Sequence, residues 1–168
     1  MLLTGTFTRS VDDKLRIAIP KGLRDCFASE TGSILYVAPG TDGSLSLYPE
    51  EAFARLAERL GSVSPNARQV RDYSRLFYSQ ACRVDLDRQG RVRIPGQLAE
   101  LAGLGKEAIL LGVQDHLELW DQVRWKHYLG EKQLQYDEIA EAAFGGPGLQ
   151  PTNTDIPGAI DSPLRAPK

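Results

Sequence analysis

Polar and apolar residues alternate along two short stretches of the chain, and each stretch ends in a proline. In residues 84–95, a polar turn (Asp87 to Gly90) separates two such segments, and Gly90 can adopt a positive φ without steric cost. Arg91 to Ile94 alternate with a period of two, which predicts a half-buried strand. Pro95 lacks the N–H that a strand ladder needs and suits the first turn of a helix. The pattern therefore predicts a strand, a turn, a strand and a helix in succession.

Residues 10–20 repeat this pattern 75 positions earlier in the chain. The same offset aligns the aspartates, the arginines, the apolar strand residues and the prolines: Asp12 with Asp87, Arg16 with Arg91, Ile17 with Val92, Ile19 with Ile94, and Pro20 with Pro95. Further on the offset becomes 72, because Leu45–Tyr48 aligns with Leu117–Trp120, and a longer loop in the first copy explains the difference. The shared order predicts two like halves in tandem, with a chance alignment of strands as the less economical alternative.

Helical patterns flank and connect these halves. Residues 49–61 open with a proline and two acidic residues and carry one apolar face, as expected of a helix. A second helix is predicted between the halves. Three arginines recur on one side of it at helical spacing: Arg68, Arg71 and Arg75. They either contact phosphates or form a solvated helix face.

These elements predict an α+β fold dominated by strands. We expect a first repeat over residues 1–61, a connecting helix over 62–79, and a second repeat with a C-terminal helix over 80–144. Residues 145–168 hold five prolines within 147–168 and little apolar material, so they cannot bury enough surface to offset their ordering entropy. This tail is predicted to be disordered.

The composition limits the class of protein. The 168 residues are 42% hydrophobic and 25% charged, which is typical of a soluble globular protein. No apolar run approaches the ~20 residues that span a bilayer, and the N-terminus lacks the features of a secretory signal. Cys26 and Cys82 fit a reducing compartment and show no metal-ligand spacing. We therefore expect a cytoplasmic protein without a metal site or cofactor.

Charge is distributed unevenly along the chain, although the net charge is only −2. Residues 66–98 carry seven arginines against three aspartates, a balance of +4 (7 − 3). Residues 99–144 carry nine acidic residues against four basic ones, a balance of −5 (4 − 9). Such a polarised molecule can present a basic face to a polyanion even though its pI is below neutral.

No catalytic constellation is evident in the sequence. His116 and His127 are the only histidines, and neither has a partner at the spacing of a metal site or a catalytic triad. Phosphate-loop, dinucleotide and nucleophile-elbow motifs are missing. Asp12 and Asp87 each stand close to an arginine, which favours a structural role in which the carboxylate accepts turn N–H bonds and orients the arginine. We therefore do not expect an enzyme.

The two D-x-x-x-R turns, each followed by a strand, a proline and later a Leu-x-Leu-aromatic segment, resemble the MraZ family over roughly residues 1–144. That family comprises bacterial transcriptional regulators of the division and cell wall gene cluster, related to the AbrB and MazE folds. The resemblance implies two AbrB-like repeats interleaved into a small swapped-hairpin (double-split) barrel with flanking helices. It also implies a ring-like homo-oligomer that is associated with the nucleoid and binds direct repeats in promoter DNA, including the promoter of its own operon. Neither a membrane nor a small-molecule substrate is implied as a partner.

Carried over to this sequence, the resemblance makes Arg16 and Arg91 the DNA-reading residues, with Asp12, Asp87 and Gly90 shaping the turns. An arginine that follows a protruding turn can donate two hydrogen bonds to guanine O6 and N7, a contact worth ~1–3 kcal/mol of discrimination. Phosphate contacts, which set register and salt dependence but carry no sequence information, are expected from four further cations: Lys14, Arg88, Arg93 and Arg9.

Two alternatives stay open at this point. Leu15 occupies the place of Gly90 in the first turn, so either it costs about 1 kcal/mol or more at positive φ, or the turn changes type, or that turn never needed glycine. On this ground we expect Arg91 to be the stronger DNA contact. The MazE branch of the superfamily also makes an antitoxin-like module possible, which would bind a partner protein, with the proline-rich tail as a docking segment.

Overall fold

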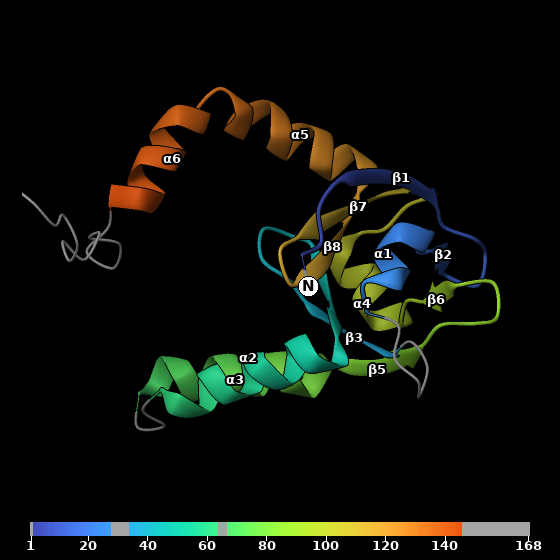
Figure 1. Cartoon of the computed structure of the whole chain (residues 1–168), viewed down its shortest axis with the longest axis horizontal. Coiled ribbons are helices and arrows are strands. Elements are labelled where there is room, and N and C mark those ends of the chain that lie inside the picture. The colour runs from blue at the N-terminus through green and yellow to red at the C-terminus, as the bar shows by residue number, and fades with distance from the viewer. Residues whose placement is uncertain (1, 28–33, 64–66, 146–168) are drawn as a thin grey trace, which may run out of the picture. The chain divides into compact units, whose positions relative to one another are not determined.

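The computed structural model describes residues 2–27, 34–63 and 67–145 (Figure 1). The chain divides into two compact units, Met1–Leu129 and Gly130–Lys168, which we treat separately. The predicted disordered tail lies outside the described residues, apart from Gly145 at its start. Among the described residues, no helix combines the length and the apolar character needed to cross a membrane.

Within the described residues, six strands form one sheet in the order β1–β7–β8–β4–β3–β5, and β2 and β6 form a separate two-stranded ribbon. All pairings are antiparallel. The strands are β1 (Thr6–Ser10), β2 (Arg16–Ala18), β3 (Ile34–Pro39), β4 (Leu45–Pro49), β5 (Cys82–Asp85), β6 (Arg91–Arg93), β7 (Glu107–Val113) and β8 (His116–Asp121).

The helices lie between and after these strands. They are α1 (Lys21–Asp25), α2 (Glu50–Ser62), α3 (Arg68–Gln80), α4 (Gly96–Ala102), α5 (Gln122–Gln133) and α6 (Tyr136–Gly145). Three of them begin directly after a proline, because a fixed φ suits the first turn and no N–H is lost there: Pro20 before α1, Pro49 before α2, and Pro95 before α4. The strand-rich α+β class predicted from the sequence is confirmed.

Equivalent strands of the two halves pair with each other. In the ribbon, Ile17 lies opposite Val92, so aligned residues of the two D-x-x-x-R copies face each other across β2 and β6. In the large sheet β4 pairs with β8, again between aligned segments. The first strand of each half pairs with the hairpin of the other half, β1 with β7 and β5 with β3. The two halves therefore share their strands and cannot form separate cores.

One apolar core, drawn from both halves, fills the space between the ribbon and the large sheet. Its largest fully buried side chains include Ile17, Leu47, Val92 and Leu119. Buried and partly buried residues alternate along the first four positions of β3 and of β8, whereas β4 and β7 carry runs of buried residues and so are covered on both faces. Burial of such side chains stabilises the fold by ~1.5–3 kcal/mol each, so the core anchors the ribbon firmly.

Aromatic side chains join α2, α3 and α5 to the large sheet. Phe53 of α2 stacks on Tyr36 of β3, with ring centroids 4.3 Å apart, and Phe77 of α3 lies 6.0 Å from Phe53. Trp125 of α5 packs on Trp120 of β8. In Figure 1, α2 and α3 lie side by side against the end of the sheet near β3.

Candidate nucleic-acid interface

The β2–β6 ribbon has one apolar face and one basic face. Ile17 and Val92 are fully buried in the core. Because neighbouring residues of a strand point to opposite faces, the residues on either side of them face outward. These outward positions are Arg16, Ala18, Arg91 and Arg93, with Arg16 opposite Arg93 and Ala18 opposite Arg91. The ribbon thus carries three arginines on its solvent side.

The first turn is built around the carboxylate of Asp12. One oxygen, Oδ1, accepts the backbone N–H bonds of Lys14 and Arg16, both at 2.9 Å. The other, Oδ2, accepts bonds from Nε and Nη2 of the Arg16 guanidinium, both at 2.7 Å. A backbone bond of 2.8 Å from Leu15 N–H to the Asp12 carbonyl closes the turn. One side chain therefore shapes the loop and fixes the arginine.

The second turn repeats this arrangement almost atom for atom. Oδ1 of Asp87 accepts the N–H groups of Gln89 and Arg91 at 2.9 and 3.0 Å, and Oδ2 accepts Nε and Nη2 of Arg91 at 2.7 Å. Gly90 N–H bonds to the Asp87 carbonyl at 2.8 Å. The side chains of Arg16 and Arg91 are each 29% exposed, so neither is turned into the core.

Both turns require a positive φ at the same position. Gly90 has a φ of 72°, and Leu15, its counterpart, has a φ of 58°. The turn therefore keeps its type, and leucine adopts a conformation that costs an L-residue roughly 1–2 kcal/mol. Leu15 packs against the core, and this contact offsets part of the cost. The aspartates hold Arg16 and Arg91 through the same atoms at the same distances, so the geometry gives no ground for ranking one above the other.

The ion pairs keep the two aspartates charged at a lower pH than is usual for this side chain, because they lower the pKa of each carboxyl. Hydrogen bonds from the Arg16 side chain and backbone lower the pKa of Asp12 to about 2. The same contacts from Arg91 lower the pKa of Asp87. Oδ2 engages Nε and Nη2 of each arginine, so the Nη1 group stays clear of this contact. Each arginine is thus held by its aspartate and retains donors for another acceptor.

The other predicted phosphate contacts lie in different settings. Lys14 and Arg88 are exposed on the turns, and Arg93 is exposed on the ribbon. Arg9 is half-buried on β1, where its guanidinium lies over the Phe7 ring at 5.7 Å from the centroid, and its buried Nε has no hydrogen-bond partner. The structure therefore gathers three of these cations around the two turns and holds Arg9 against a ring of its own strand.

Sequence reasoning did not single out Arg24 of α1. Its guanidinium lies against Gly90, at the place that a Cβ would occupy, and its Nε is buried without a hydrogen-bond partner. Gly90 is buried beneath it. Only the pairing of the halves brings α1 to the second turn, through the bond from Ile19 N–H to the Gly90 carbonyl. In the sequence, only the glycine at position 90 could have indicated that another group lies close to this turn.

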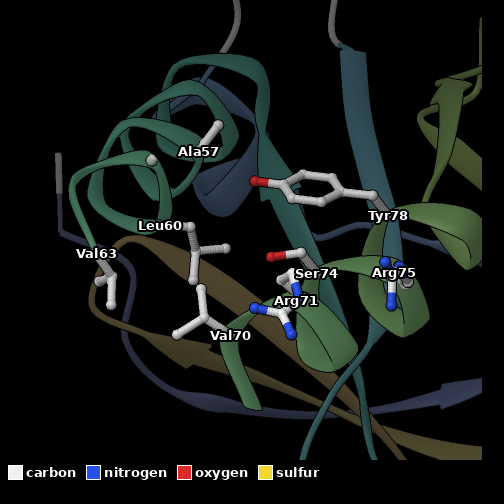
Figure 2. A pocket seen from close by; sticks show the side chains of 9 residues that line it. Ala57, Leu60, Val63, Val70, Arg71, Ser74, Arg75 and Tyr78 are labelled. Carbon is white, nitrogen blue, oxygen red and sulfur yellow. The ribbon is translucent and has the colours of Figure 1, made fainter. Parts of the chain in front are cut away.

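A hollow between α2 and α3 is an alternative site (Figure 2). Its volume is about 420 Å³. The described residues that line it carry no carboxylate, histidine or thiol group; they are Ala57, Leu60, Gly61, Val63, Val70, Arg71, Ser74, Arg75 and Tyr78. Nor do the described residues contain a group of three or more potential ligands placed to hold a metal ion. This hollow offers an apolar surface with a basic margin.

Known proteins resemble this chain over the region that contains these residues. A family model described as "MraZ protein, putative antitoxin-like" matches residues 77–146, which include the second turn and β6. A protein named "Transcriptional regulator MraZ" from Finegoldia magna is 36% identical over 135 residues, covering 80% of this chain and 92% of that protein. The chain belongs to the MraZ family.

Further MraZ relatives agree over similar lengths. The proteins of that name from Bifidobacterium longum and Frankia alni are 37% and 34% identical over 140 and 145 residues. They cover 83% and 86% of this chain, and 91% and 99% of their own lengths. The resemblance to the MraZ family inferred from the two turns is thus confirmed, and the relatives carry the name of transcriptional regulators.

Proposed function

We propose that this member of the MraZ family is a non-enzymatic, sequence-specific DNA-binding transcription regulator. It acts as a homo-oligomer in the cytoplasm, at the nucleoid, on direct repeats in the promoter of the division and cell wall gene cluster, including its own operon. The observation that carries the proposal is the ribbon with two aspartate-clamped arginines, Arg16 and Arg91, on its solvent side.

The physical argument starts from the shape of the ribbon. A two-stranded antiparallel ribbon fits the major groove, where arginine is the commonest partner of guanine. Arg16 and Arg93 lie directly opposite each other, and like charges in that arrangement repel. A polyanion relieves this repulsion. The exposed Lys14, Arg88 and Arg93 then contact phosphates and set the salt dependence.

We further infer that the fold comprises two tandem AbrB-like repeats interleaved into a swapped-hairpin barrel. The repeats are residues 1–61 and 80–144, joined by a connector over residues 62–79 that holds all of α3 except its last residue, Gln80. The exchange of β1 and β5 between the halves and the pairing of β2 with β6 support this proposal. The barrel lets one chain display two D-x-x-x-R turns where a single repeat would need a partner chain.

Self-association is proposed because one unit makes few base contacts. Display of several units on repeated sites raises the effective concentration and multiplies the affinity. Large apolar side chains exposed on α3 supply a surface for such association: Leu76 is 65% exposed and Tyr73 is 46% exposed. The ring-like assembly of the proposal would use this surface.

A mobility-shift assay on the DNA upstream of the protein's own gene tests the function. Arg16→Ala and Arg91→Ala should each weaken specific binding by roughly 5- to 150-fold, since each removes a contact worth ~1–3 kcal/mol. Arg59→Ala, in an exposed arginine of α2, is the matched control and should bind like the parent protein. Circular dichroism checks the fold of each variant. Unchanged binding by both ribbon variants would reject the proposal.

A second candidate is an antitoxin-like module that binds a partner protein, which the wording of the matching family model favours. The apolar hollow between α2 and α3 would supply the docking surface (Figure 2). Purification with a stoichiometric second protein, together with no shift of the upstream DNA, would support this candidate over the first.

A further inference from the structure

The two turns differ in where their neighbouring cations come from. At the first turn, Arg93 of the second half lies opposite Arg16. At the second turn, the equivalent position opposite Arg91 is held by Ala18, which carries no charge. Arg93 and Ala18 are aligned by the 75-residue offset between the two copies. The first turn therefore has a cation on the strand paired with it, and the second turn has none at that position.

Arg24 occupies the complementary place at the second turn. It lies on α1 of the first half, with its guanidinium against Gly90. The residue aligned with it in α4 is again an alanine, Ala99. Each turn therefore has one arginine from the opposite half of the chain, Arg93 at the first turn and Arg24 at the second. In both cases the aligned residue of the other copy is an alanine, Ala18 for Arg93 and Ala99 for Arg24.

Within the part of the chain that the structure describes, the Arg24 side chain keeps an unpaired donor. Its Nε is buried and has no hydrogen-bond partner, and no ion pair involves its guanidinium among the described residues. The side chain is only half-buried, so part of it stays open to solvent. A planar guanidinium with an unpaired donor, placed against Gly90 of the second turn, is suited to donate two hydrogen bonds to the oxygens of a phosphate.

We propose that Arg24 contacts a phosphate of the DNA backbone at the second turn, as the counterpart of Arg93 at the first. The inference rests on the proposed DNA-binding function. Each turn then presents three cations drawn from both halves: Lys14, Arg16 and Arg93 at the first, and Arg88, Arg91 and Arg24 at the second. A phosphate contact carries no sequence information, so Arg24 adds affinity for any duplex.

The salt dependence of binding tests this role. The logarithm of the binding constant falls with the logarithm of salt concentration by about 0.9 for each phosphate contact. Arg24→Gln removes the charge and keeps most of the side-chain volume. It should lower the slope by about one for both promoter and unrelated duplex DNA, with no change in the preference between them. Arg59→Ala should leave the slope as it is.

Charge relocation separates a DNA contact from a purely structural role. Ala18 is exposed, so Ala18→Arg introduces a cation opposite Arg91, as Arg93 lies opposite Arg16. The double variant Arg24→Gln with Ala18→Arg should regain the parental slope. An unchanged slope in Arg24→Gln would overturn the inference, and so would a reduced slope that Ala18→Arg does not restore. If Arg16→Ala and Arg91→Ala also bind normally, the proposed function itself fails.

Discussion

Replacement of Gly90 by alanine tests the physical basis of the second turn. The backbone there has a φ of 72°, which costs an L-residue ~1–2 kcal/mol. A Cβ would also overlap the Arg24 guanidinium, and displacement of that side chain from its rotamer costs ~0.5–1.5 kcal/mol. Reduced freedom of the unfolded chain returns ~0.4–1 kcal/mol. The net loss of unfolding free energy should be about 2 kcal/mol.

Urea unfolding at one fixed protein concentration measures this loss, because association would otherwise change the apparent stability. Gly61→Ala is the matched control. Gly61 lies in α2 with open space where its Cβ would be, so alanine should stabilise the helix by ~0.5–1 kcal/mol. On a thermal scan, Gly90→Ala should lower the Tm by roughly 4–8 °C.

A double-mutant cycle separates the two terms. If Arg24 resists the new methyl group, Arg24→Ala should recover the overlap part, ~0.5–1.5 kcal/mol, and leave the backbone strain in place. A Gly90→Ala protein as stable as its parent would refute the reasoning for this turn. Additive effects in the cycle would show that Arg24 does not press on Gly90.

Two further predictions concern pH. The pKa of Asp12 is lowered from 3.8 to about 2 in the folded protein, so its ion pair stabilises the protein fully above pH 3.8. This stability is lost as the pH falls toward 2. In Asp12→Asn, the urea midpoint should therefore depend less on pH over that range. Burial alone would lower the pKa of His116, but the carboxylates of Glu118 and Asp115 raise it above 6.5. Its stabilising contribution is complete below pH 6.5 and is lost as pH rises through the higher folded value, so His116→Gln should flatten the decline in stability above pH 6.5.

The sequence was sufficient for the elements that depend on local pattern. Alternation identified both ribbon strands, and proline marked the starts of α1 and α4, because these signals act within a few residues. The offset of 75 residues also aligned Asp12 with Asp87, whose hydrogen bonds are nearly identical in the structure. In a tight turn, a carboxylate four residues before an arginine lies within hydrogen-bond distance of the guanidinium and of the turn N–H groups.

Features that depend on contacts between the halves were out of reach. The φ of Leu15 follows from a balance between backbone strain and packing on a core that includes residues of the other half, and no local pattern reports that balance. Arg24 meets Gly90 only because α1 lies beside a turn from 66 residues later in the chain (90 − 24). The sequence predicted a single C-terminal helix in the second repeat, whereas the structure divides that stretch into α5 and α6.

An arginine held by an aspartate is a better DNA reader than a free one. Ordering a free arginine side chain costs up to ~1.5–2 kcal/mol of rotamer entropy, and in the DNA-binding role that we propose Asp12 and Asp87 would bear that cost before DNA arrives. Each aspartate occupies Nε and one hydrogen of Nη2, so the outer edge of Arg16 or Arg91 keeps donors on Nη1 and Nη2. That edge has the geometry of a bidentate contact with guanine. The ion pairs therefore preorganise the interface, and the core beneath Ile17 and Val92 gives both arginines the same rigid support.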